Sequence, residues 1–355
     1  MDKSRRNLLK VGAAVTAGAA GVLSGSAFGA QNEQQAGTAI KSIPPLASQL
    51  GARLVTYRVG GASSVGVVLD NGRVLDLKSE AHARRLKLAF DPSSMLSLIK
   101  AGDPALHQVK LLSEHPHSAS LPLDKVELLS PIPRPERNIN CVGWNYLDHF
   151  EEGQAVRSDN KMKTLPAHPV FFSKATHTMN GPFGSIPYDA ANSTSTDWEA
   201  ELAVIIGRTG INIAEADAMD YVFGYSAYND TTEREVQQKR HGGQWFKGKS
   251  LDGHGPMGPW IVTAAGVKLD DVRIICRVNG VEKQNASYQQ MYFKIPRIIA
   301  ELSRGMTLEA GDIIATGTPP GVGFARKPPE FLKPGDIMET EIVGVGLLRN
   351  DIRPV

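Results

Sequence analysis

Two glutamates, Glu199 and Glu201, open an apolar run that continues to Gly207. Side chains alternate across a β-strand and each residue rises about 3.3 Å, so both carboxylates would share one face about 6.6 Å apart. Two negative charges that close together beside a buried run need a counter-charge. Because hard divalent cations such as Mg²⁺ and Ca²⁺ prefer oxygen ligands, the pair predicts half of a metal site.

A third carboxylate, Asp230, ends the apolar run Tyr225–Asn229. A carboxylate at the end of a strand, where the chain turns, is a natural third ligand for the cation. The same position also suits the N-cap of a helix that begins at Thr231. This residue alone leaves both interpretations open.

His149 and Glu152 follow the strand-like run Ile139–Val142. In a helix, residues three apart share a face, so the carboxylate can orient the imidazole and raise its basicity. A histidine oriented in this way can take a proton from water. The alternative is an exposed helix start capped by Asn145 or Asp148.

Further polar residues lie in segments that can line a pocket. Lys249 can hold a substrate carboxylate or a developing oxyanion, although most lysines face solvent. Arg234 and Gln237, one turn apart, can line a pocket or lie on an exposed helix. The stretch Thr316–Pro319 allows a ligand to approach the backbone closely, and a plain turn is the competing interpretation.

The first thirty residues resemble a twin-arginine export signal. Arg5 and Arg6 precede an uncharged stretch from Val11 to Ala30, which ends in small residues that suit cleavage between positions 27 and 30. The alternative is an uncleaved membrane anchor. An export signal predicts a periplasmic or secreted protein with no stable membrane association after cleavage.

The charge of the remaining chain argues against a nucleic-acid partner. The full chain has 39 basic and 37 acidic residues, and removal of residues 1 to 30 leaves 35 and 36, a formal net charge of −1. A near-neutral protein lacks the basic surface that nucleic acid requires.

Changes in composition along the chain divide it into four segments. They are a signal peptide over 1–30, a flexible lead-in over 31–50, a small N-terminal α/β domain over 51–130 and a catalytic domain over 131–355. Asp70–Gly72 predicts a hairpin turn and Ser93–Ala101 a helix within the small domain. Pro131, Pro133 and Pro135 predict an extended linker.

Beyond the linker, short apolar runs alternate with Gly and Pro. We expect strands at residues 138–142, 170–172, 200–206, 222–228, 260–262, 272–278, 313–316 and 337–342, with helices of any length only at 215–221 and 295–304. This pattern predicts a mixed, β-rich α/β sandwich or roll, not a doubly wound sheet. Cys141 and Cys276 lie in apolar runs and are expected to be buried free thiols.

Taken together, residues 137 to 352 resemble the fumarylacetoacetate hydrolase family. The segments that carry the resemblance are Asn-Tyr-x-Asp-His-x-x-Glu at 145–152, Asp-x-Glu-x-Glu-Leu at 197–202, the run that ends at Asp230, Arg-x-x-Gln at 234–237, Gly-Lys-Ser-x-Asp at 248–252, Val-Asn-Gly at 278–280 and Gly-Asp-x-Ile-x-Thr-Gly-Thr-Pro at 311–319. Their order along the chain is the specific part of the signal.

The resemblance implies three groups of site residues. They are the metal ligands Glu199, Glu201 and Asp230, the catalytic residues His149, Glu152, Lys249 and Gln237, and the substrate-binding residues Tyr146, Arg234 and Thr318. The implied cofactor is Mg²⁺, with Mn²⁺ or Ca²⁺ as alternatives, and the implied assembly is a homodimer.

The resemblance also implies a substrate class and a reaction. Family members act on 1,3-diketo or 2-oxo acids, whose enolate chelates the metal and accepts the electron pair of a broken C–C bond. We therefore expect a metal-dependent hydrolase that cleaves a C–C bond in an acylpyruvate-like acid. A decarboxylase, isomerase or hydratase of the same family is the alternative, since fold and metal do not determine the reaction. An exported protein that binds an oxo acid or metal without turnover is a third possibility, but it has no need of the His149/Glu152 pair.

Overall fold

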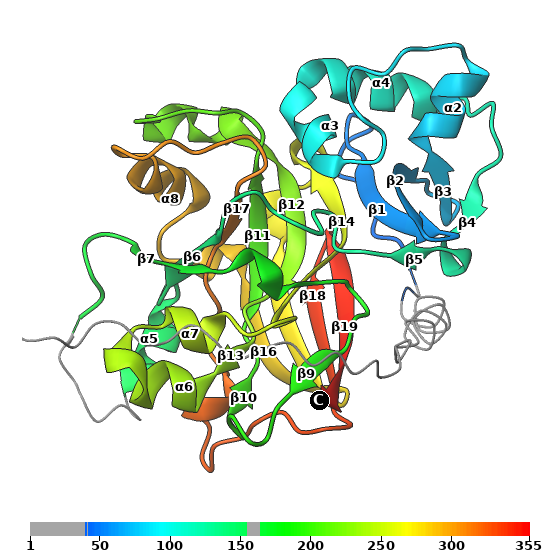
Figure 1. Cartoon of the computed structure of the whole chain (residues 1–355). Helices are drawn as coiled ribbons and strands as arrows, with labels where there is room; N and C mark the ends of the chain where they lie inside the picture. Colours follow the sequence, from blue (N-terminus) through cyan, green and yellow to red (C-terminus); the bar gives the residue numbers. More distant parts are fainter. Residues whose placement is uncertain (1–39, 41, 155–163) are drawn as a thin grey trace, which may run out of the picture.

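A twelve-stranded mixed sheet forms the centre of the molecule (Figure 1). The computed structural model describes residue 40 and residues 42–154 and 164–355. Ten strands lie in the hydrogen-bonded order β4 (Leu121–Pro122), β3 (Arg73–Asp76), β2 (Ala62–Val68), β1 (Arg53–Val59), β14 (Gly255–Thr263), β12 (Val222–Asn229), β11 (Ala200–Ile206), β17 (Ile313–Ala315), β6 (Ile139–Gly143) and β7 (Val170–Lys174). Beside this path, β5 (Glu127–Leu128) pairs with β1 and β8 (Met179–Asn180) with β14.

A second sheet packs against the first. It has five strands in the order β16 (Val281–Ser287), β15 (Arg273–Val278), β18 (Ile337–Ile342), β19 (Gly346–Pro354) and β9 (Ile186–Tyr188). Inward side chains of both sheets, among them Leu202, Ile274 and Leu348, are fully buried in one shared core. A short ribbon of β10 (Thr196–Asp197) and β13 (Thr232–Glu233) links the segments before β11 and after β12.

Seven α-helices cover the sheets in the described chain. They are α2 (Leu77–Ala83), α3 (Met95–Ala101), α4 (Asp103–Glu114), α5 (Leu147–Gln154), α6 (Arg234–Lys239), α7 (Phe246–Lys249) and α8 (Ile295–Leu302). The first three cover the N-terminal strands, whereas α5, α6 and α7 gather beside β6 and β7 (Figure 1). Loops that enter and leave this second group surround the ends of β6, β11 and β12, and so frame the carboxylates discussed below.

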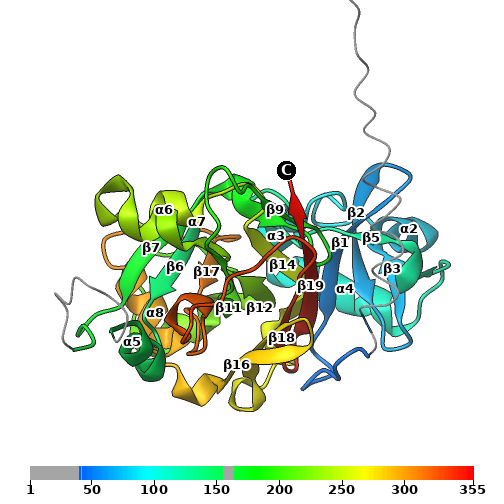
Figure 2. The same cartoon turned by 90° about the horizontal axis from the view of Figure 1, so that it is seen from below.

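The N-terminal strands extend the main sheet (Figure 2). β1 pairs antiparallel with β14, with Leu54 opposite Ile261. The chain that precedes β1 is also attached there, since the Ala47 amide donates to the carbonyl of Gly266 at 2.9 Å. The predicted boundary near residue 130 stays a prediction.

Most predicted elements are present. The mixed, sheet-rich α/β class is confirmed, β2 and β3 form the expected hairpin, and β11 and β18 begin and end where the apolar runs do. Cys141 and Cys276 are buried and unpaired.

Several helices and two long strands differ from the sequence expectation. Residues Glu215–Tyr221 form a 3₁₀ helix, and α5, α6 and α7 are too short to show a helical period. β16 and β19 were not predicted because polar residues such as Asn350 occupy inward positions that a hydrophobic pattern leaves out.

The predicted twin-arginine signal lies outside the described residues. Within the part of the chain that the structure describes, no helix is long and apolar enough to cross a bilayer.

Candidate active site

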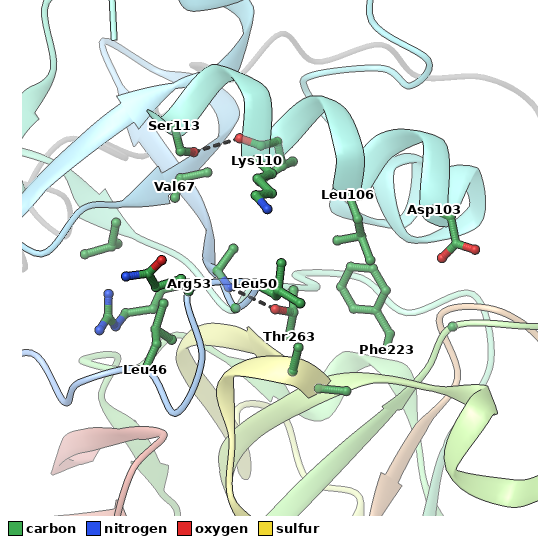
Figure 3. A pocket seen from close by; sticks show the side chains of 18 of the residues that line it. Leu46, Leu50, Arg53, Val67, Asp103, Leu106, Lys110, Ser113, Phe223 and Thr263 are labelled. Atoms are coloured by element: carbon green, nitrogen blue, oxygen red, sulfur yellow. Dashed lines mark hydrogen bonds between the residues drawn. The ribbon is translucent and has the colours of Figure 1, made fainter. Parts of the chain in front are cut away.

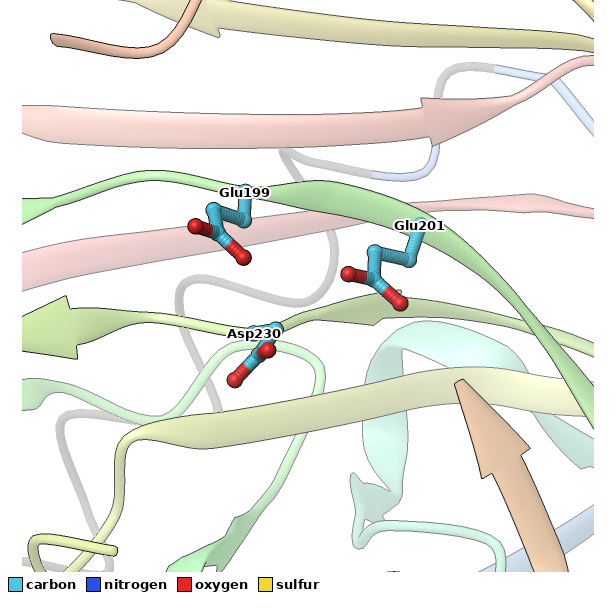
Figure 4. A group of neighbouring side chains, drawn as sticks. All are labelled: Glu199, Glu201 and Asp230. Atoms are coloured by element: carbon cyan, nitrogen blue, oxygen red, sulfur yellow. The ribbon is translucent and has the colours of Figure 1, made fainter. Parts of the chain in front are cut away.

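The three predicted ligands meet at one end of β11 and β12. Glu201 lies opposite Tyr228 in the antiparallel pair, so the next residues outward, Glu199 and Asp230, also face each other. The amide of Asp230 donates to the carbonyl of Glu199 at 2.9 Å, which continues the ladder past both strand ends. As a result, one carboxylate oxygen of each ligand lies within 4.8 Å of the others (Figure 4).

Buried cations compensate two of these carboxylates. Lys249 Nζ lies 2.6 Å from Glu199 Oε2 and 2.7 Å from Asp230 Oδ2. Arg234 Nη2 lies 2.7 Å from Glu199 Oε1, and Lys174 Nζ lies 2.7 Å from Asp230 Oδ1. In the described chain no cationic side chain pairs with Glu201, whose Oε2 instead accepts the Gly317 amide at 2.8 Å.

The pKa directions follow this unequal distribution of charge. Burial would raise the pKa of Glu199, but Lys249 and Arg234 hold it at about 2. Burial, together with the charges of Asp230 and Glu199, raises the pKa of Glu201 well above its ordinary value. Glu201 is therefore the carboxylate of the cluster that lacks a compensating positive charge.

This donor set fits a hard divalent cation. All three donors are carboxylate oxygens, which Mg²⁺, Mn²⁺ and Ca²⁺ prefer, and they come from two adjacent strands of a rigid sheet. The ammonium of Lys249 between Glu199 and Asp230 marks a place where positive charge is already favoured. A divalent cation bound among the three carboxylates would also compensate the charge of Glu201.

His149 and Glu152 are paired beside the three ligands. His149 is buried on α5, and its Nδ1 lies 2.8 Å from Glu152 Oε1. The other carboxylate oxygen of Glu152 accepts the amide of Gly321 at 2.9 Å. Because Glu152 occupies Nδ1, the second ring nitrogen of His149 is the one left for proton transfer.

Asn145 does not cap helix α5, contrary to the alternative interpretation. Its side-chain nitrogen donates to the carbonyls of Thr316 and Phe293, and its oxygen accepts the Phe293 amide at 2.7 Å. Asn145 thus ties the start of α5 to the loop after β17, which keeps His149 close to Thr318.

Arg234 and Gln237 are buried on α6 and line the same cavity as Glu199 and Glu201. Arg234 Nε pairs with Asp197 Oδ2 at 2.7 Å, and its Nη1 donates to Gln237 at 3.2 Å. Asp197 also accepts the amides of Gly323 and Phe324. Arg234 therefore holds Glu199 in place, and its predicted contact with substrate stays a prediction.

Thr318 and Tyr146 occupy different positions relative to the cavity. Thr318 lines it, but its hydroxyl already donates to the Ala200 carbonyl at 3.0 Å and accepts from Gln284 at 2.7 Å. Tyr146 lies in the core, and it is not among the residues that line the cavity. The structure brings Thr318 to the cavity and does not bring Tyr146 there.

Lys174 is a site residue that the sequence reasoning missed. It ends β7, is fully buried, and touches Asp230 across the sheet. The local run Phe171–Ala175 carries no signal for this contact, because a lysine at a strand end usually faces solvent.

The cavity that these residues line is small. It measures about 20 Å³ and includes Trp144, Phe172 and Trp245 on its apolar side. A larger cavity of about 690 Å³ lies between α4 and the main sheet (Figure 3). That second cavity contains none of the carboxylate ligands, and its lining mixes cations such as Lys110 with acids such as Asp103.

Comparisons with known proteins agree with this geometry. Residues 138–353 match the family model described as fumarylacetoacetate (FAA) hydrolase C-terminal. The oxaloacetate tautomerase YisK of Bacillus subtilis is 40% identical over 296 residues, which cover 81% of this chain and 95% of that protein.

Solved structures match most of the chain. A fumarylacetoacetate hydrolase from Exiguobacterium antarcticum superposes with a TM-score of 0.72 at 36% identity, covering 86% of this chain and 100% of that one. The maleylpyruvate hydrolase of Sphingobium sp. SYK-6, in complex with manganese(II) and pyruvate, has a TM-score of 0.67 at 29% identity and covers 85% and 99%. These matches confirm the predicted family fold, and the tautomerase relative favours the isomerase alternative over the hydrolase prediction.

Proposed function

This chain belongs to the fumarylacetoacetate hydrolase family, and we propose that it is a keto–enol tautomerase of a short 2-oxo acid, with oxaloacetate as the substrate. The observation that carries the proposal is the His149–Glu152 pair, whose imidazole lines the same small cavity as Glu199 and Glu201. Tautomerisation needs a group that moves a proton between carbon and oxygen, and it consumes no water.

Glu199, Glu201 and Asp230 would hold a divalent cation, for which we propose Mg²⁺. When bound, the cation would act as a Lewis acid that polarises the oxygen atoms of the substrate and lowers the energy of its enolate form. The neighbour that binds manganese(II) and pyruvate supports a metal and a 2-oxo acid in this site.

The protein's own groups account for the proton transfer. Glu152 fixes the orientation of the His149 ring, so the free ring nitrogen can remove the proton at C3 and return it at the enol oxygen. Lys249, with its ammonium held by Glu199 and Asp230, supplies positive charge near the position where the oxygen becomes negative.

The test follows enol-oxaloacetate in the presence of Mg²⁺ by its ultraviolet absorbance, with malate dehydrogenase to trap the keto product. Loss of the enol above the buffer-catalysed rate, with malate as the sole product, is the expected result. Pyruvate formation would instead identify a decarboxylase. Cleavage of acylpyruvates without tautomerase activity would restore the hydrolase prediction.

We also propose that the protein is exported by the twin-arginine route and forms a homodimer. Replacing Arg5 and Arg6 by lysine should leave the protein in the cytoplasm. Unchanged export would contradict the first proposal, and a monomeric mass in sedimentation analysis would contradict the second.

A further inference from the structure

One side of the catalytic cavity is built from aromatic rings. Trp245 lies edge-on to Trp144, with ring centroids 5.0 Å apart, and edge-on to Phe172 at 5.2 Å. Its indole also rests on Gly143, where a Cβ atom would come within 2.7 Å of the ring. Because Gly143 has no side chain, the indole of Trp245 can pack against its backbone at the cavity wall.

Another part of the cavity wall is held by ion pairs. Glu199 contacts the cations of both Lys249 and Arg234 at 2.6 and 2.7 Å, and all three side chains are buried. Moving any of them would separate buried charges, which is strongly unfavourable. This side of the cavity is therefore rigid.

The cavity leaves too little room for a substrate unless a wall residue moves. Its volume of about 20 Å³ accommodates about one water molecule. Among the residues that line it, Trp245 has the least restrained surroundings. It is partly exposed, its neighbours from His241 to Gln244 are exposed, and His241, Gly242 and Gly243 all have positive φ.

We propose that Trp245 is the specificity-determining wall of the site and limits the substrate to short 2-oxo dicarboxylic acids of about the length of oxaloacetate. This inference rests on the proposed function. A short acid needs only a small displacement of the indole, whereas each added methylene must push Trp245 further from Gly143, Trp144 and Phe172. Long diketo or diene acids are excluded by the same ring contacts.

The experiment measures ligand binding, independently of turnover. Dissociation constants of oxalate, 2-oxoglutarate and 2-oxoadipate for the Mg²⁺-loaded protein are obtained by calorimetry. For the wild type we expect affinity to fall about 10-fold or more from 2-oxoglutarate to 2-oxoadipate, since one methylene in a closed pocket discriminates about 10- to 200-fold. Trp245→Ala should bind 2-oxoadipate about 10-fold more tightly than the wild type and oxalate about equally.

Phe246→Ala is the matched control, because Phe246 is the adjacent aromatic residue on α7 and is 46% exposed. It should keep the wild-type length preference. Trp245→Phe, which retains a ring, should give an intermediate preference even if the alanine variant folds poorly. An unchanged length preference in Trp245→Phe and Trp245→Ala would overturn the inference.

The two proposals fail in different ways. If enol-oxaloacetate is not turned over but Trp245→Ala still gains affinity for 2-oxoadipate, the tautomerase proposal fails and the proposed role of Trp245 is kept. If turnover is found and both Trp245 variants discriminate ligand length as the wild type does, the proposed role of Trp245 fails and the tautomerase proposal is kept.

Discussion

The Nζ atom of Lys174 lies 2.7 Å from Oδ1 of Asp230, and both side chains are fully buried. Lys174 also donates to the Thr231 carbonyl at 3.0 Å, while Lys249 contacts the other oxygen of Asp230. Asp230 is thus held from both sides, which fixes the rotation of its carboxylate before any metal binds. A pre-oriented ligand loses less conformational entropy on coordination.

Lys174→Met should destabilise the metal-free protein by about 3–5 kcal/mol, because it leaves a buried carboxylate short of a counter-charge. The free energy of unfolding is measured by urea titration without metal and with saturating Mg²⁺. We expect Mg²⁺ to recover part of the loss, since the cation supplies positive charge at the same cluster.

Lys100→Met is the control for Lys174→Met. Lys100 pairs with Glu136 at the surface, so its loss should change stability by about 1 kcal/mol or less. Equal effects of the two substitutions would contradict the structural role of Lys174.

Glu152→Gln should lower kcat about 100-fold and leave KM nearly unchanged. The amide cannot stabilise the protonated ring of His149 as a carboxylate does, and general acid–base catalysis contributes about 10²–10⁴-fold. Steady-state kinetics of enol-oxaloacetate loss give both constants. Glu151→Gln, the exposed neighbour on α5, should behave as the wild type. A Glu152 variant with full kcat would remove the basis for proton transfer through His149.

The metal ligands could be predicted from the sequence because their signal is local. Glu199 and Glu201 share a face through the two-residue period of a strand, and Asp230 ends the strand that pairs with theirs. The His149–Glu152 contact follows in the same way from the spacing of a single helical turn.

The supporting contacts could not be predicted, because they join distant segments. Lys174 meets Asp230 through the order β7, β6, β17, β11, β12 of the sheet, which no short motif encodes. Asp197 belonged to a recognised motif, but its partner Arg234 and the amides of Gly323 and Phe324 depend on how loops from three parts of the chain converge.

A pH dependence of stability is expected from Glu80, a fully buried residue of α2. Burial alone would raise its pKa, but the amides of His117 and Ser118 and the guanidinium of Arg84 lower the pKa from 4.5 to about 2. A carboxylate with a depressed folded-state pKa stabilises the protein above its unfolded pKa, and that contribution is lost as pH falls toward 2.

Glu80→Gln should therefore lower the free energy of unfolding by about 3 kcal/mol at neutral pH, since one pKa unit is worth about 1.4 kcal/mol. The difference from the wild type should shrink as pH falls from 4.5 to 2 in urea titrations. Glu114→Gln, at the exposed end of α4, should show no such pH-dependent difference. A Glu80 difference that is constant between pH 7 and pH 2 would disprove this assignment.

Arg234 links Asp197 to Glu199 through two different nitrogens, each 2.7 Å from its carboxylate. A lysine keeps the positive charge but lacks the planar guanidinium, whose separate nitrogens contact the two acids in a fixed geometry. Arg234→Lys should therefore weaken Mg²⁺ binding about 10- to 100-fold, the usual effect of removing a residue that orients a metal ligand. Calorimetric titration with Mg²⁺ measures this affinity directly.

Arg240→Lys, which alters an exposed pair with Glu235 just past the end of the same helix, is the matched control and should bind Mg²⁺ normally. Unchanged Mg²⁺ affinity in Arg234→Lys would mean that β11 alone places Glu199, and it would free the guanidinium for the substrate contact that the sequence predicted.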